Sequence, residues 1–156
     1  FRRVLFRSLY KGLKVQMGQE EEEEYHSAQD NVVTAIGKLI LHRGKEYSNL
    51  KEIIQTWLDN LPIVTDLVES AGQHDLLCDI VINSSEMIFG ENNKNVPKII
   101  KVLCKVINSK YSNDKVDAKI KTILQEMKNS ALVSFVPEAK KGASDKVKKK
   151  IKQYLE

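Results

Sequence analysis

Apolar residues along the chain recur three and four positions apart, which places them on one face of a helix. The clearest faces predict four helices, at residues 27–43, 50–61, 65–81 and 96–107. Two more helices are expected, one over residues 116–127 and a last one that begins at Ser144. No stretch alternates apolar and polar residues for long enough to indicate a strand. The pattern therefore predicts an all-α fold.

The expected helix boundaries coincide with residues that start or stop helices. Ser27 stands three positions before Asp30, as in a capping box with Asp in place of Glu, so the first helix is expected to begin there. Thr65 is the expected N-cap of the third helix, and Pro62 is expected to end the second. Gly37 lies inside the first helix, where we expect it to allow close helix packing rather than to bind a ligand.

The sharpest boundary is the segment Gly90–Ile100, with the sequence GENNKNVPKII. Gly90 and the asparagine pair that follows Glu91 adopt positive φ at low cost, so a turn is expected here. Asn95 is expected to accept hydrogen bonds from the free N–H groups that begin the next helix. Pro97 lies just inside that helix, where its missing N–H costs little. We predict a helix-to-helix corner with an architectural role.

The expected helices form pairs that begin near residues 27, 65 and 115, a period of ~40–50 residues that is typical of two-helix repeats. Stacking of successive pairs buries the apolar face that each helix exposes alone. We therefore expect two repeats, residues 27–62 and 63–110, followed by a terminal capping repeat at residues 111–156. Residues 9–26 are expected to hold the end of a preceding repeat and a solvated acidic linker, because Glu20–Glu24 are five like charges in a row.

The first eight residues, FRRVLFRS, fit no pattern that follows and read like a sequencing adapter translated in frame. We expect residues 1–8 to be a non-native scar, with the natural N-terminus missing, and leave them out of fold reasoning. Without Arg2, Arg3 and Arg7 the formal charge falls from +4 to +1. Overall basicity therefore does not favour nucleic acid as a partner.

Residues that could hold a metal or act as nucleophiles are scattered. His26, His42 and His74 lack the spacing of metal ligands, and Cys78 and Cys104 form no CxxC motif. The two cysteines are expected to be buried, reduced thiols, which is typical of the cytosol or nucleus. No glycine-rich phosphate loop occurs, and no apolar run approaches the ~20 residues of a membrane-spanning helix.

Three other features invite a functional interpretation. Trp57 lies among apolar positions, so core packing is favoured over ligand stacking. Asp75 and Asp79 share a helix face, as paired catalytic carboxylates would, but solvated helix charges are far commoner. The lysine-rich segment Lys146–Lys152 is expected to be a solvated helix that caps the array, with nucleic-acid binding as the alternative. We expect no catalysis, no metal and no cofactor.

Four segments occur in an informative order: DNVVTAIGKLI at residues 30–40, WLDNLPI at 57–63, LCDIV at 77–81 and the corner at 90–100. Taken together they resemble the C-terminal HEAT repeats of karyopherin-β (importin) nuclear import receptors, in the Ran-dependent subfamily that carries ribosomal proteins and histones. The resemblance covers about residues 27–130. The chain departs from the family after the Trp-Leu-Pro helix, where the usual acidic cluster is weak, and in its more basic tail.

The resemblance implies a superhelical HEAT solenoid of which this chain is a C-terminal fragment. It implies that the receptor binds basic cargo proteins on its inner surface, phenylalanine-glycine nucleoporins outside, and Ran-GTP mainly through N-terminal repeats. It places the protein in the cytoplasm, the nucleus and the nuclear pore, away from membranes, and we also expect a monomer. The alternative is a HEAT or armadillo scaffold that organises other proteins without transporting them.

The resemblance also assigns roles to individual residues. The second helix of each pair would face inward, which makes the following polar residues candidates for partner binding: Lys51, Glu52, Gln55, Asp59, Lys98, Lys101 and Lys105. Structural roles are expected for Trp57, Pro62, Gly90, Asn95 and Pro97.

Overall fold

The structure, a computed structural model, describes residues 8, 11 and 22–156. Its described part contains helices and turns but no strand, which confirms the predicted all-α class. The longer helices are α2 (Glu22–Arg43), α3 (Leu50–Asp59), α4 (Leu67–Asn83), α6 (Val96–Val106), α7 (Asp114–Lys128) and α9 (Asp145–Leu155). The shorter ones are α5 (Ser85–Ile88), α8 (Val136–Lys140) and the 3-10 helices η2 (Gly44–Glu46), η3 (Glu91–Asn93) and η4 (Ala131–Phe135).

The predictions for residues 1–8, and for most of residues 9–26, lie outside the described residues.

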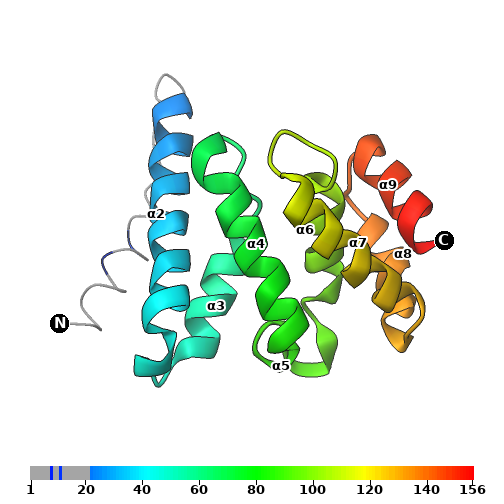
Figure 1. Ribbon diagram of the computed structural model, residues 1–156, viewed down its shortest axis with the longest axis horizontal. Coiled ribbons are helices and arrows are strands. Elements are labelled where there is room, and N and C mark those ends of the chain that lie inside the picture. The colour runs from blue at the N-terminus through cyan, green and yellow to red at the C-terminus, as the bar shows by residue number, and fades with distance from the viewer. Residues whose placement is uncertain (1–7, 9–10, 12–21) are drawn as a thin grey trace.

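The long helices pack on one another in chain order. Helix α2 packs on α3 and α4, and α4 packs on α7. Helix α6 packs on α8 and α9, and α9 also packs on α7. Figure 1 shows α2, α4 and α7 following one another across the molecule, with α9 at the far end from α2. The helices are therefore arranged as a row rather than around one centre.

Helix α2 begins earlier than the sequence pattern predicted. It starts at Glu22, so Ser27 is an internal residue and the predicted capping box is wrong. The predicted solvated loop is also wrong over Glu22–Glu24, which belong to the helix. Glutamate is a good helix former, which is consistent with helical backbone at these residues.

Three later helices begin at a residue whose side chain caps the first turn. Ser144 accepts from the N–H of Val147 at 3.4 Å, as the predicted start of the last helix requires. Asn113 caps α7 in the same way. The predicted cap of α4 is wrong by one residue, because Asp66 rather than Thr65 accepts from the first amides of that helix. A carboxylate is the stronger acceptor at a helix N-terminus.

The corner at Gly90–Ile100 has the predicted backbone but not the predicted cap. Gly90, Asn92 and Asn93 have φ of 72°, 53° and 58°, which confirms the positive-φ turn. Pro97 lies in the first turn of α6, as expected. Asn95 makes no side-chain cap; its Nδ2 instead donates to the carbonyl of Ile88 at 2.8 Å. The prediction that Asn95 accepts from the new helix is therefore wrong.

Buried polar contacts join α2 and α3 to α4 and to the residues just before it. The Asp30 carboxylate, only 7% exposed, accepts from the backbone N–H of Thr65 at 2.8 Å and of Asp66 at 3.0 Å. Trp57 is fully buried, and its Nε1 donates to Gln73 Oε1 at 3.0 Å. The expected core role of Trp57 is therefore confirmed, with a polar contact that fixes its orientation.

Gly37 provides the space for this Trp57–Gln73 contact. A Cβ atom on Gly37 would lie 2.8 Å from Gln73 Cδ and 2.9 Å from Trp57 Nε1. Real Cβ atoms do not approach other heavy atoms so closely, so any side chain here would displace the pair. This confirms the prediction that Gly37 allows close helix packing.

The segment before the last helix is helical rather than extended. Residues Ala131–Phe135 form η4 and residues Val136–Lys140 form α8. Leu132 and Phe135 are half-buried against the core. Pro137 lies in the first turn of α8, where proline is well tolerated.

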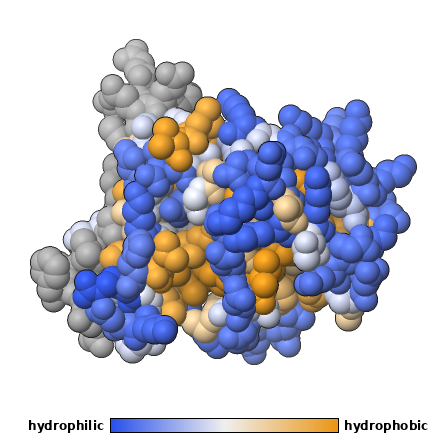
Figure 2. Space-filling view, viewed as in Figure 1, coloured by the Kyte–Doolittle hydropathy of each residue, from blue (hydrophilic) through white to orange (hydrophobic). Residues whose placement is uncertain are grey.

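Figure 2 shows hydrophobic side chains in the seams between neighbouring helices of the viewed face. A separate hydrophobic group covers the start of α4, where Leu67 is 47% exposed and Val68 is 89% exposed. Ile82, near the other end of α4, is also 47% exposed.

Candidate functional site

The predicted partner-binding residues of α3 divide into two halves. Lys51 and Glu52 are exposed in the first turn, and Glu52 Oε2 accepts from Asn49 Nδ2 at 3.2 Å. Gln55 and Asp59 lie one and two turns further on, where Gln55 Nε2 donates to Asp59 Oδ1 at 2.8 Å. Among the described residues, only this second half forms hydrogen bonds with α6 or its N-cap residue.

Two contacts join α3 to α6. Asn95 Nδ2 donates to Gln55 Oε1 at 2.6 Å, and the Lys98 ammonium lies 3.5 Å from the carbonyl oxygen of Asp59. The structure therefore places the predicted residues at the end of α3, Gln55 and Asp59, beside Lys98, the first predicted residue of α6. Because both Gln55 and Asn95 are used in this joint, their amides are committed to packing rather than free for a partner.

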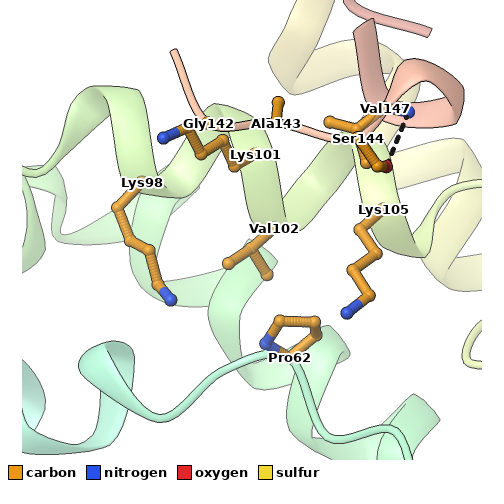
Figure 3. Close-up of a pocket in the computed structure, with 9 residues that line it drawn as sticks. All are labelled: Pro62, Lys98, Lys101, Val102, Lys105, Gly142, Ala143, Ser144 and Val147. Atoms are coloured by element: carbon orange, nitrogen blue, oxygen red, sulfur yellow. Dashed lines mark hydrogen bonds between the residues drawn. The ribbon is translucent and has the colours of Figure 1, made fainter. Parts of the chain in front are cut away.

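The three predicted lysines of α6 share one cavity, which we call the lysine pocket. Its volume is about 270 Å³. It is lined by Lys98, Lys101 and Lys105, together with Pro62, Val102, Gly142, Ala143, Ser144 and Val147. Figure 3 shows Lys98 and Lys105 extending toward Pro62 on either side of Val102, while Lys101 extends toward Gly142. The pocket thus has an apolar floor and three cationic side chains on different sides.

The lysine pocket brings three positively charged side chains close together. Burial lowers the pKa of Lys98 from its ordinary value, the nearby Asp59 raises it, and Lys101 and Lys105 lower it further. Among the described residues, none of these three ammonium groups forms an ion pair with a carboxylate. Glu138 interacts electrostatically with Lys101, but it forms its ion pair with Lys141, at 2.6 Å.

A second cavity lies between α4 and α7, and we call it the apolar pocket. Its volume is about 280 Å³. It is lined by Val81, Ile82, Ser85, Phe89, Ile123, Glu126, Met127, Ser130 and Leu132. Most of these side chains are hydrophobic, and they come from α4, α5, α7 and the start of η4. The sequence pattern placed Val81, Ile123 and Met127 on apolar helix faces but gave no sign that a hollow lies between them.

The candidate catalytic carboxylates Asp75 and Asp79 both form ion pairs with lysines of α7. Lys119 of α7 pairs with both, at 2.6 Å to Asp75 and 2.5 Å to Asp79, and Lys115 pairs with Asp75 at 2.8 Å. Burial alone would raise the pKa of Asp75, but the hydrogen bonds from Lys115 and Lys119 lower it. The hydrogen bonds from Asp75 and Asp79 in turn raise the pKa of Lys119. This cluster holds α4 against α7.

The buried histidine and cysteines are also parts of the core. His74 is fully buried, where Nε2 accepts from the N–H of Ile63 at 3.2 Å and Nδ1 donates to the carbonyl of Tyr111 at 2.9 Å. Cys78 and Cys104 are free and fully buried, and burial raises the pKa of each thiol to about 12. Thiols with so high a pKa are poor nucleophiles at neutral pH.

The last helix packs by its apolar face and exposes most of its lysines. Val147, Ile151 and Leu155 are buried, which confirms the predicted packing face of α9. Lys150 differs from the other lysines, because its ammonium donates to the carbonyl of Ile107 at the end of α6. Burial lowers the pKa of Lys150, as expected for an amine used in packing. The exposed lysines remain a positively charged outer face.

The pattern of the sequence could not show that the loop before α9 closes over the α6 lysines. The only signal was Gly142, which has φ of 66° and marks the turn that brings Ala143 and Ser144 to the pocket.

No protein-family model matches the chain. In the part of the chain that the structure describes, no helix has both the length and the hydropathy needed to span a membrane. Nor do three or more His, Cys, Asp or Glu side chains come together there as metal ligands would.

Proposed function

We propose that this chain is a non-catalytic protein-binding module built from stacked antiparallel helix pairs, in the manner of a HEAT solenoid. More specifically, we propose that it is the C-terminal part of a nuclear import receptor of the karyopherin-β class, which moves between cytoplasm and nucleus. The pairs would be α2 with α3, α4 with α6, and α7 with α9. The observation that carries the proposal is the row of helices, in which each first helix packs on the next: α2 on α4 and α4 on α7.

The residues that carry the family resemblance add support, because they lie at joints between these pairs. Asp30 holds the amides of Thr65 and Asp66 at the start of the second pair. Trp57 of the first pair contacts Gln73 of the second. A set of residues that fixes the angle between successive pairs is what a superhelical array requires.

The apolar pocket suits the phenylalanine side chain of a nucleoporin repeat. It lies between α4 and α7, the first helices of two pairs, which the resemblance places on the outer surface. Its hydrophobic lining and volume of about 280 Å³ fit a single aromatic ring better than a whole small molecule. We therefore propose this pocket as a nucleoporin contact, independent of Ran-GTP.

This contact is tested with a peptide that contains repeated phenylalanine-glycine pairs. Ile82→Gln should weaken its binding several-fold, because Ile82 lines the pocket yet is 47% exposed and so contributes little to the core. Val68→Gln, at a position 89% exposed on the same helix, is the matched control and should bind like the wild type. Equal binding by both variants, measured by isothermal titration calorimetry, would reject the apolar pocket as the contact.

The transport role itself is tested on a full-length receptor that contains this region. It should capture basic cargo proteins and release them on addition of Ran-GTP. The polar residues of α3 and α6 include four lysines against two acidic side chains, so we expect the basic cargo to be held elsewhere in the receptor. Capture that is insensitive to Ran-GTP would favour the alternative, a scaffold that organises proteins without transporting them.

A further inference from the structure

The lysine pocket has features that neither the proposed transport role nor the helix packing explains. Its three ammonium groups belong to one face of α6, at positions 98, 101 and 105, and the charges of Lys101 and Lys105 help to lower the pKa of Lys98. Bringing like charges together opposes folding unless an opposite charge offsets them. Among the described residues no carboxylate forms an ion pair with any of the three. Asp59 acts on Lys98, and Glu138 interacts with Lys101, without forming an ion pair with either lysine. A ligand could therefore supply the direct negative partners that the three lysines lack.

The placement of the lysines indicates the shape of that ligand. Lys98 and Lys105 extend toward Pro62 on either side of Val102, whereas Lys101 extends toward Gly142 (Figure 3). The three charges are therefore spread around the pocket rather than directed at one point. A single phosphate would be contacted by only part of this set. An extended ligand with several separate negative charges matches all three.

The floor of the pocket indicates a second requirement. Pro62, Val102, Ala143 and Val147 provide apolar surface between the charged side chains. The volume of about 270 Å³ is below that of most sites for whole small molecules, and suits one apolar side chain. Ser144 and Val147 belong to the N-terminal turn of α9, which already carries the acidic residue Asp145.

We propose that the lysine pocket binds an acidic peptide segment of a partner protein, in which carboxylates flank one apolar side chain. The apolar side chain occupies the floor at Val102 and Val147, and the flanking carboxylates pair with the lysines. This partner is opposite in charge to the basic cargo of the proposed receptor. The proposal goes beyond the transport role and does not depend on it.

The first test uses the full 156-residue chain and the peptide Glu-Glu-Leu-Glu-Glu with blocked ends, followed by amide chemical shifts in NMR. Binding should move the signals of Val102, Ala143 and Val147, and weaken as salt is raised. Replacing Leu by Ser, or all Glu by Gln, should each weaken binding by at least about fivefold. A Lys-Lys-Leu-Lys-Lys peptide should not bind. Equal binding of the acidic and neutral peptides would overturn the proposal.

The second test uses variants. Lys98→Gln with Lys105→Gln should weaken the acidic peptide about five- to tenfold, as expected for the loss of two partly exposed ion pairs. Lys121→Gln, at an exposed position on α7, is the matched control and should bind like the wild type. Far-UV circular dichroism and melting temperature check that both variants fold. Unchanged binding by the folded double variant would overturn the proposal.

Two further outcomes identify a different occupant and would also overturn the proposal. Full competition with the peptide by inorganic phosphate or a short oligodeoxynucleotide, at equal charge concentration, would define a phosphate site. Alternatively, the chain could associate with itself through the run Glu20–Glu24 of a second copy, which sedimentation velocity would detect as a dimer.

Discussion

At the scale of single residues, Gly37 and Gly72, each inside a long α-helix, have opposite surroundings. Gly37 on α2 faces the buried Trp57–Gln73 contact, and a Cβ atom there would lie 2.9 Å from Trp57 Nε1. Around Gly72 on α4, no heavy atom outside its own helix backbone and its chain neighbours lies within 4 Å of the position that a Cβ would take. The same residue type is therefore required at one position and costs stability at the other.

This contrast gives a matched pair of substitutions. Gly72→Ala should stabilise the chain by about 0.5–1 kcal/mol, because alanine loses less backbone entropy in a helix. Gly37→Ala gains the same propensity but separates the Trp57 and Gln73 side chains, so a net loss of about 1–2 kcal/mol is expected. Urea unfolding followed by circular dichroism measures both. Stabilisation by Gly37→Ala would show that Gln73 moves aside without cost.

At the scale of elements, one buried side chain connects three segments. His74 of α4 accepts from the N–H of Ile63, in the connection after α3, and donates to the carbonyl of Tyr111, in the connection before α7. This arrangement requires the neutral ring, because a protonated Nε2 could no longer accept from Ile63. Burial accordingly lowers the pKa of His74 from 6.5 to about 4.

The lowered pKa makes stability depend on pH in a defined window. Between pH 6.5 and about 4 the unfolded chain binds a proton at this residue that the folded chain does not. Stability should therefore fall as the pH falls through this window, by about 3 kcal/mol in all from His74. His74→Gln preserves an acceptor and a donor without titrating, so it should flatten this part of the profile.

His42→Gln, at an exposed position near the end of α2, is the control and should retain the wild-type slope. A wild-type profile that is flat between pH 4 and 6.5 would contradict the assigned hydrogen bonds.

Sequence reasoning was most successful where a local signal decides the structure. The apolar spacing of α6 and α9, the turn at Gly90 and the cap at Ser144 all depend on neighbouring residues, and the structure confirms them. It failed where a distant residue competes for a side chain. Asn95 was expected to cap its own helix, but Gln55, forty positions earlier, accepts from its amide instead.

For the candidate site too, the sequence did not reveal the residues that only the tertiary fold brings together. The lysines of α6 were singled out through the family resemblance, which places the second helix of each pair on the inner surface. Pro62 and Gly142 could not be joined to them, since only the tertiary fold brings the end of the first pair and the loop before α9 to that face. The apolar pocket was missed for a similar reason, because a hollow between two helices leaves no local signal.

At the scale of the whole molecule, the packing is sequential. Helix α2 contacts α3 and α4, whereas α9 contacts α6, α7 and α8. A disturbance at one end should therefore reach the other end only through the intermediate helices. In a protein with one closed core it would reach all parts together.

Leu155→Ala tests this difference. Leu155 is 2% exposed at the end of α9, so its truncation should cost about 2–5 kcal/mol locally. Hydrogen exchange followed by mass spectrometry should show faster exchange in α6, α7 and α9, with α2 and α3 almost unchanged. A uniform rise in exchange across all helices would indicate a single cooperative unit.

The contacts between helices also have an order along the chain, because one residue of each contact precedes the other in the sequence. Asp30 precedes the amides of Thr65 and Asp66 that it holds, Trp57 precedes Gln73, and the carboxylate of Asp75 precedes Lys119. During synthesis on the ribosome, the acceptor or anchor of each of these joints therefore emerges before its partner. Each new pair of helices can dock as it leaves the exit tunnel, onto a surface already in place. A chain of this design can assemble from its N-terminal side without waiting for its last helix.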